Sequence, residues 1–148
     1  MQGIPNLTDI LLNPVLVVSA LVWLFAEATK IVTTKLLGQP VRPFASGGMP
    51  SAHAAIVTAA AAVIALDQGL TSPLFGLAVI VAAIVLHDAC RVRWMAGETA
   101  ERLNHLLKQS KSKLSPVTVY RGHRLSEVVV GSLFGIVLGA LFFSQLYP

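Results

Sequence analysis

Charged residues are scarce in this chain of 148 residues, at 12%, whereas apolar residues make up 55%. The mean hydropathy of +0.73 is too high for an ordinary water-soluble domain, so the composition indicates a membrane protein. The single cysteine, Cys90, excludes an internal disulfide and a cysteine-based zinc site. The length leaves no room for a soluble domain beside the membrane spans, so we expect one membrane-embedded domain over residues 1–148.

Long apolar runs take up the larger part of the chain, at about residues 14–32, 52–66, 74–86 and 128–146. They lack the alternation of a strand, and an isolated sheet could not satisfy its edges in lipid. The sequence therefore predicts an all-α, polytopic membrane protein with four transmembrane helices. Between the second and third runs, Gly69 is typical of a helix end, and Ser72 followed by Pro73 is typical of a helix start, which predicts a tight helical hairpin.

An amphipathic segment separates the third and fourth runs. From about residue 98 to residue 113 it places Leu103, Leu106 and Leu107 on one helical face and the charged residues elsewhere. We expect an interfacial helix that lies on the membrane surface, with Trp94 as its anchor. A helix that covers the bundle is the alternative.

All eleven basic residues lie in two segments, residues 30–42 and 91–124. With four spans these segments share one side of the membrane, and both termini share the other side with the turn at Asp67. The positive-inside rule assigns the basic side to the cytoplasm. Asp88 lies beside Arg91 on that side, and we expect it to be an ion-pair partner.

Small residues characterise two of the runs. The second run is rich in alanine, and the fourth carries Gly131, Gly135 and Gly139 at intervals of four, nearly along one helical face. Such faces let neighbouring helices approach closely, which is the interpretation we favour. A dimer seam along the glycines is the alternative.

Polar groups gather on the basic side. Ser51 and His53 fall in the first turn of the second helix, where free N–H groups and the helix dipole favour an anion such as phosphate. His123 and Glu127 are four residues apart, so they share a face and the carboxylate can hold the imidazole in one tautomer. The pattern predicts a histidine nucleophile with its orienting group at a phosphate site. Capping or solvated groups are the alternative.

Three strings on this side form motifs. Lys35 begins Lys-x6-Arg-Pro, and Pro50 begins Pro-Ser-Ala-His. A third string is split by an insertion into a part at Arg93 and a part at residues 122–127. In this order they resemble the motifs of the type-2 phosphatidic acid phosphatase superfamily, and more closely its divergent branch of small bacterial and plastid membrane proteins. The departures from the superfamily motifs are Ala52 for glycine, Val92 for serine and Glu127 for aspartate.

The resemblance implies metal-independent hydrolysis of a phosphomonoester, with no cofactor. It implies that His123 is the nucleophile that forms a phosphohistidine, that Glu127 fixes its tautomer, and that His53 protonates the leaving group. The residues implied to hold the phosphate are Lys35 or Lys30, Arg42, Ser51 and Arg93. Lys30 and Lys35 cannot both face the site, because five residues rotate a helix by about 140°.

These features favour a lipid phosphate phosphatase, with phosphatidylglycerol phosphate or phosphatidic acid as the candidate substrate. The alternatives are a polyprenyl pyrophosphate phosphatase and, from a different class, a non-catalytic phosphate- or lipid-binding membrane protein or small transporter. We expect a membrane lipid as the partner, and no nucleic acid. The superfamily core more usually has six helices, so we also expect a homodimer or larger assembly. The resemblance implies a bacterial inner membrane or a plastid-type membrane.

Overall fold

The computed structural model describes residues 10–36, 38, 48–120 and 122–148. Within these residues it is all-helical, with no strand. The helices in chain order are α2 (Pro14–Leu36), α3 (Ala52–Gln68), α4 (Pro73–His87), the π-helical turn η1 (Asp88–Val92), α5 (Arg93–Gln109) and α6 (Leu125–Leu146). The four membrane helices begin at, or within three residues of, the apolar runs that predicted them.

The lengths and apolar composition of the helices fit a polytopic membrane protein. Three of them are long and apolar enough to cross a membrane: Pro14–Leu36, the continuous helix Pro73–Gln109, and Leu125–Leu146. The fourth apolar helix, α3, has 17 residues, which corresponds to about 25 Å at 1.5 Å per residue. The predicted all-α membrane architecture is confirmed.

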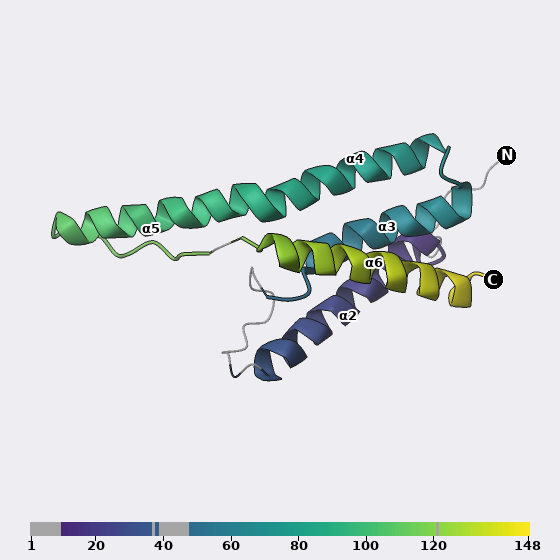
Figure 1. The fold of residues 1–148 in the computed structure, drawn as a ribbon, viewed down its shortest axis with the longest axis horizontal. Coiled ribbons are helices and arrows are strands. Elements are labelled where there is room, and N and C mark those ends of the chain that lie inside the picture. The colour runs from purple at the N-terminus through teal and green to yellow at the C-terminus, as the bar shows by residue number, and fades with distance from the viewer. Residues whose placement is uncertain (1–9, 37, 39–47, 121) are drawn as a thin grey trace.

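Helix α3 lies at the centre of the bundle and packs against α2, α4 and α6 (Figure 1). The core between α2 and α3 is built from valines and alanines, among them Val18, Val22, Ala26, Ala55 and Ala59. Small side chains on α3 let its neighbours approach closely, which explains the alanine-rich composition of this helix.

The glycines of α6 face α3 and are buried. A Cβ atom added at Gly139 would lie 2.9 Å from the Cα of Ala59, and one added at Gly135 would collide with the hydroxyl of Thr58. The glycine face is therefore occupied by α3 of the same chain. Close packing within the bundle is confirmed as the role of the stripe, and the alternative of a dimer seam along these glycines is wrong. Assembly through another surface stays a prediction.

The turn between α3 and α4 is the predicted helical hairpin. Gly69 ends α3 with a φ of 83°, and its N–H donates to the carbonyl of Ala65. The hydroxyl of Ser72 caps α4 by accepting from the N–H of Phe75 at 3.1 Å, and Pro73 occupies the first position of the helix.

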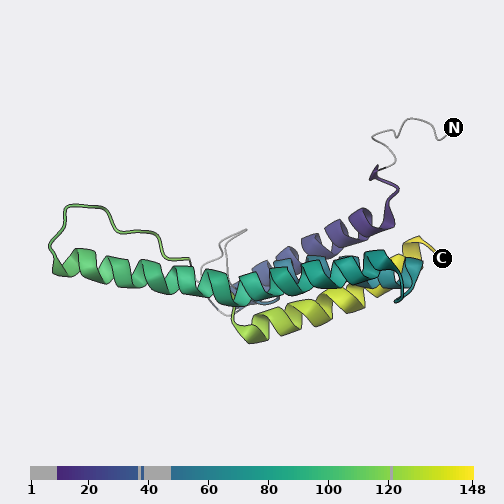
Figure 2. The same ribbon diagram turned by 90° about the horizontal axis from the view of Figure 1, so that it is seen from above.

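Helices α4 and α5 form one continuous rod through η1, and α5 extends beyond the bundle (Figure 1). The segment after α5 returns alongside it, as Figure 2 shows, and the Asn104 side chain holds it by bonds of 2.7 Å to both the N–H and the carbonyl of Val117. The amphipathic helix expected from residue 98 is thus present, but it begins at Arg93 and continues α4 as one rod. The rod is continuous because no proline or cap interrupts the helix between His87 and Arg93. It does not fold over the bundle, so that alternative is wrong, and its position at the membrane surface stays a prediction.

The two ends of the bundle differ in their polar residues, because His53, His87 and His123 lie at one end. The start of α2, the α3–α4 turn and the end of α6 lie at one end (Figure 1). The start of α3, η1 and the start of α6 lie at the other end, together with the histidines His53, His87 and His123. This second end holds the candidate site.

Candidate active site

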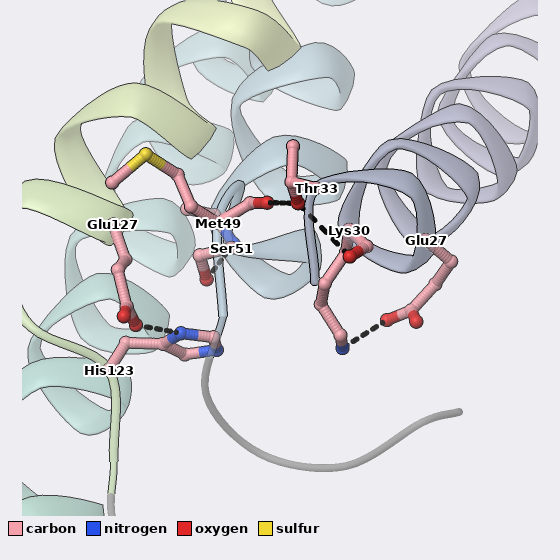
Figure 3. Close-up of polar contacts among 8 residues, drawn as sticks. Glu27, Lys30, Thr33, Met49, Ser51, His123 and Glu127 are labelled. Atoms are coloured by element: carbon pink, nitrogen blue, oxygen red, sulfur yellow. Dashed lines mark hydrogen bonds and ion pairs between the residues drawn. The ribbon is translucent and has the colours of Figure 1, made fainter. Parts of the chain in front are cut away.

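A short segment before α3 is tied to both α2 and α6 (Figure 3). The hydroxyl of Thr33 on α2 donates to the carbonyl of Met49 at 2.8 Å. The N–H of Ser51 donates to the carbonyl of Glu127 on α6 at 3.2 Å. Because these bonds hold the segment from both sides, the start of α3 is fixed between the helices that carry the other polar residues.

Ser51 is completely buried and caps α3. Its hydroxyl accepts from the N–H of Ala54 at 3.4 Å. The Ser51 hydroxyl therefore acts as a helix cap in this structure, and the binding of phosphate by the same hydroxyl stays a prediction.

The two halves of the split third motif meet in space. The N–H of His123 donates to the carbonyl of Ala89 in η1 at 3.0 Å. Gly122 passes so close to this helix that an added Cβ would lie 2.7 Å from the amide nitrogen of Trp94 and 2.9 Å from the Cβ of Arg93. The insertion is thus accommodated outside the site, as α5 and the segment that returns from it.

His123 and Glu127 form the pair that the sequence predicted. His123 Nδ1 lies 2.9 Å from Glu127 Oε2, and the His123 side chain is 3% exposed. An ionised carboxylate can only accept a hydrogen bond, so Nδ1 carries the proton, and in the neutral ring Nε2 then has a free lone pair. In Figure 3 this second nitrogen faces away from Glu127, toward the side on which Lys30 lies. The arrangement is that of an oriented histidine nucleophile.

His53 lies beside this pair. The rings of His53 and His123 are 6.3 Å apart between centroids and are inclined by 60°. Arg93, His123, Lys30 and Glu27 all lie close enough to His53 to act electrostatically on its imidazole. Side chains from α2, α3, α5 and the start of α6 therefore meet at one place. His53, Arg93, His123 and Glu127 come from the second and third motifs, whereas Lys30 of α2 lies outside the first motif.

Of the two candidate lysines on α2, only Lys30 lies at the site. Its side chain is 8% exposed, and its ammonium lies 3.1 Å from Glu27 Oε1, whereas Lys35 is exposed. Glu27 itself was not among the predicted site residues. Its Oε2 is buried and has no hydrogen-bond partner in the described part of the chain. A signal was present in the sequence, because Glu27 is the sole acidic residue of the first apolar run, and an ionisable residue inside a span is most often functional.

Arg93 is paired at the edge of the site. Its Nε lies 2.9 Å from Asp88 Oδ2, with both side chains 41% exposed. Asp88 is an ion-pair partner as expected, but its partner is Arg93 and not the neighbouring Arg91. A pair this exposed is weak, so Arg93 can exchange Asp88 for an anionic ligand at little cost. Arg42, the remaining predicted cation, lies outside the described residues.

An open groove of about 890 Å³ adjoins His123 on the side away from α2. It lies between the end of α4 with η1 and the start of α6. The groove is predominantly apolar, with two arginines among its lining residues: Leu86, His87, Cys90, Arg91, Trp94, His123, Arg124, Leu125, Val128, Val129, Ser132 and Leu133. An apolar groove that reaches a polar site suits an amphiphile with a hydrocarbon chain.

The fold and the site together define a class: a polytopic helical membrane protein with a histidine–carboxylate site at one end of its bundle. The chain belongs to the Divergent PAP2 family, whose model matches residues 11–138. It is 35% identical to the uncharacterized membrane protein YuiD of Bacillus subtilis (strain 168), over an alignment of 150 residues that covers 88% of this chain and 94% of the relative. No solved structure matches the chain. The family resemblance of the three motifs is confirmed.

Proposed function

We propose that this protein hydrolyses the phosphomonoester of a membrane lipid through a phosphohistidine on His123. The observation that carries the proposal is the buried His123–Glu127 pair at 2.9 Å with the His53 ring 6.3 Å from that of His123. A binding site needs cations, but it has no need of an imidazole whose tautomer is fixed by a carboxylate beside a second imidazole.

In the first step, Nε2 of His123 attacks phosphorus. The bond between phosphorus and the ester oxygen of the lipid breaks, and protonated His53 gives its proton to the departing alkoxide. Glu127 remains ionised and stabilises the positive charge that develops on the His123 ring. Lys30 and Arg93 act on the non-bridging oxygens, whose charge is spread in the transition state.

In the second step, water attacks the phosphohistidine. His53, now neutral, takes a proton from this water, the nitrogen–phosphorus bond breaks, and inorganic phosphate leaves. The neutral ring of His123 with its proton on Nδ1 is restored, and His53 is protonated again. The cycle needs no group other than water and these side chains.

The groove beside His123 supports a lipid as the substrate. Leu86, Val128, Val129 and Leu133 line it, so a hydrocarbon chain placed there would meet apolar side chains, as it does among the lipid tails of the bilayer. Phosphatidic acid and phosphatidylglycerol phosphate are the first substrates to test, and a polyprenyl pyrophosphate is the third.

The proposal is tested by phosphate release from purified protein in detergent. His123→Ala is expected to abolish hydrolysis and any trapped phosphoenzyme, while Glu127→Gln and His53→Ala reduce kcat by about 10²-fold or more. His105→Ala is the control, because His105 lies exposed on α5 outside the site. Hydrolysis at the wild-type rate by His123→Ala would overturn the mechanism, and binding of phospholipid without turnover by the wild-type protein would indicate a non-catalytic site.

A further inference from the structure

The first step of the proposed reaction needs two positive charges beside the same phosphate. Lys30 acts on the non-bridging oxygens, and His53 must be protonated to give its proton to the leaving alkoxide. The two charges disfavour each other, because like charges at short range repel. Arg93 adds a further positive charge within electrostatic reach of His53. A negative charge close to His53 would let the imidazole hold its proton while Lys30 holds the phosphate.

Two of the carboxylates at this end of the bundle serve other groups. Glu127 holds Nδ1 of the nucleophile at 2.9 Å, and Asp88 pairs with Arg93 at the exposed edge. In the part of the chain that the structure describes, Glu27 is the acidic residue that acts electrostatically on His53. The groups that act on this imidazole come from α2, from α5 and from the segment before α6: Glu27, Lys30, Arg93 and His123.

The surroundings of Glu27 make its charge effective. Its side chain is 13% exposed, so little water screens it. One carboxylate oxygen, Oε1, pairs with the Lys30 ammonium at 3.1 Å (Figure 3). The other, Oε2, is buried and accepts no hydrogen bond from the described residues. A buried carboxylate oxygen without a donor is costly, and an ionisable residue inside an apolar helix is most often functional.

We propose that Glu27 is a positioning residue that keeps His53 protonated in the presence of Lys30. As seen from His53, the ion pair of Glu27 and Lys30 is close to neutral. Lys30 can therefore bind the phosphate without expelling the proton that the leaving alkoxide needs. The inference rests on the proposed function, because it takes His53 as the acid of the first step.

The test is a charge cycle, read from the pH dependence of kcat/KM for the lipid phosphate that the protein hydrolyses. Glu27→Gln should move the alkaline limb, where the acid loses its proton, to lower pH by about one pH unit. Lys30→Gln should move this limb to higher pH, because a cation beside the imidazole is removed. The double variant should return it close to its wild-type position, since a neutral pair is replaced by two neutral side chains.

The controls separate this role from a structural one. The substrate ionises in the same way for every variant, so a difference between variants belongs to the enzyme. Glu98→Gln is the matched control and should leave the limb in place, because Glu98 pairs with Arg102 on the exposed part of α5. A loss of kcat/KM at every pH in Glu27→Gln without movement of the limb would overturn the proposal. Movement in the same direction by Glu27→Gln and Lys30→Gln would also overturn it.

The proton on His53 can be followed without turnover. In purified protein with isotope-labelled histidine, the nuclear magnetic resonance signal of His53 is assigned as the one missing from His53→Ala. Its titration midpoint should be lower by about one pH unit in Glu27→Gln than in the wild type. If no lipid phosphate is hydrolysed, the proposed function fails and this titration decides alone. The lower midpoint then supports the action of Glu27 on His53, and an unchanged midpoint overturns it.

Discussion

Glu27 and Lys30 are two opposite charges buried one helical turn apart in an apolar helix. Each would be costly to place there alone, and the ion pair at 3.1 Å neutralises both. Lys30 therefore reaches the site with its charge already balanced. An incoming phosphate must compete with Glu27 for the ammonium, so Glu27 reduces the affinity of the site for anions.

Replacing Glu27 with glutamine tests this competition. Glu27→Gln keeps an acceptor for Lys30 but removes the negative charge, so we expect inorganic phosphate to bind about fivefold more tightly, as product inhibition would measure. Glu98→Gln is the control, because Glu98 pairs with Arg102 four residues along an exposed helix. Weaker binding by Glu27→Gln would contradict the competition and show that the carboxylate is needed to place Lys30.

Gly122 has a steric role next to His123. In Gly122→Ala the new Cβ would lie 2.7 Å from the Trp94 nitrogen and 2.8 Å from the Ala89 carbonyl, which must push His123 away from η1. We expect kcat to fall by about 10²-fold with little change in folding, since a displacement of about 1 Å has that effect on catalysis. Gly76→Ala on α4 is the control, because no atom lies within 4 Å of its added Cβ. Equal activity of the two variants would contradict the role of this contact.

The sequence predicted the His123–Glu127 pair from a helical spacing of four residues, but His123 lies two residues before the start of α6. The pair forms because the Glu127 side chain turns back over the first turn of α6, where it also accepts from the N–H of Arg124 at 3.2 Å. The sequence could not choose between Lys30 and Lys35, since the choice depends on which face of α2 packs against α3. The pairing of Asp88 with Arg93 instead of Arg91 has the same cause, because it depends on the path of the helix through η1. The position of Glu27 was readable, but its contact with the site depends on packing between helices.

At the scale of elements, the contact between α3 and α6 is the most extensive in the described bundle. Ala55 and Thr58 lie against Gly135, where no side chain fits. Thr58 also donates from its hydroxyl to the carbonyl of Ser132 on α6 at 3.1 Å. The two helices that carry His53 and Glu127 are thus held together by packing that tolerates little change in size.

Gly135→Leu is expected to destabilise the fold by about 3 kcal/mol, because the added side chain must separate α3 from α6. Thermal unfolding in detergent measures this, with Gly76→Leu as a control at an open position. Light scattering of the same samples separates the two roles considered for the glycines. If Gly135→Leu unfolds at the wild-type temperature but no longer forms a larger assembly that the wild type forms, the glycines do not act by packing α6 against α3.

Helix α5 shows which features a local sequence pattern can predict and which it cannot. Its leucines and charges predicted a helix correctly, since helical amphipathicity depends only on nearby residues. Its direction depends on the five residues of η1, which widen one turn without breaking the rod. No residue in that stretch signals the π-helical turn, so the direction of α5 was not predictable from the sequence, although the absence of a proline between His87 and Arg93 was readable.

For the whole molecule, the arrangement of the ends leads to a prediction of sidedness. The α3–α4 turn lies at the opposite end of the bundle from η1 and α5 (Figure 1), and the positive-inside rule directs the basic end to the cytoplasm. In a Cys90→Ser background, Gln68→Cys is expected to react with an impermeant thiol reagent in intact cells, and Lys113→Cys to react only after permeabilisation. Both new cysteines stand at exposed positions. The reverse labelling pattern would show the opposite orientation.

The chain comes back to η1 at Gly122, and this contact bears on how well the protein tolerates insertions between Arg93 and His123. The chain leaves the site at Arg93 and re-enters at His123, and both points lie against η1. We therefore expect the site to tolerate a longer or shorter segment between these two points, provided that each end keeps its own short motif. A search for relatives that demands a fixed spacing would overlook such chains. For the same reason, a fluorescent reporter spliced into the turn near residue 112 would leave the histidines where they are.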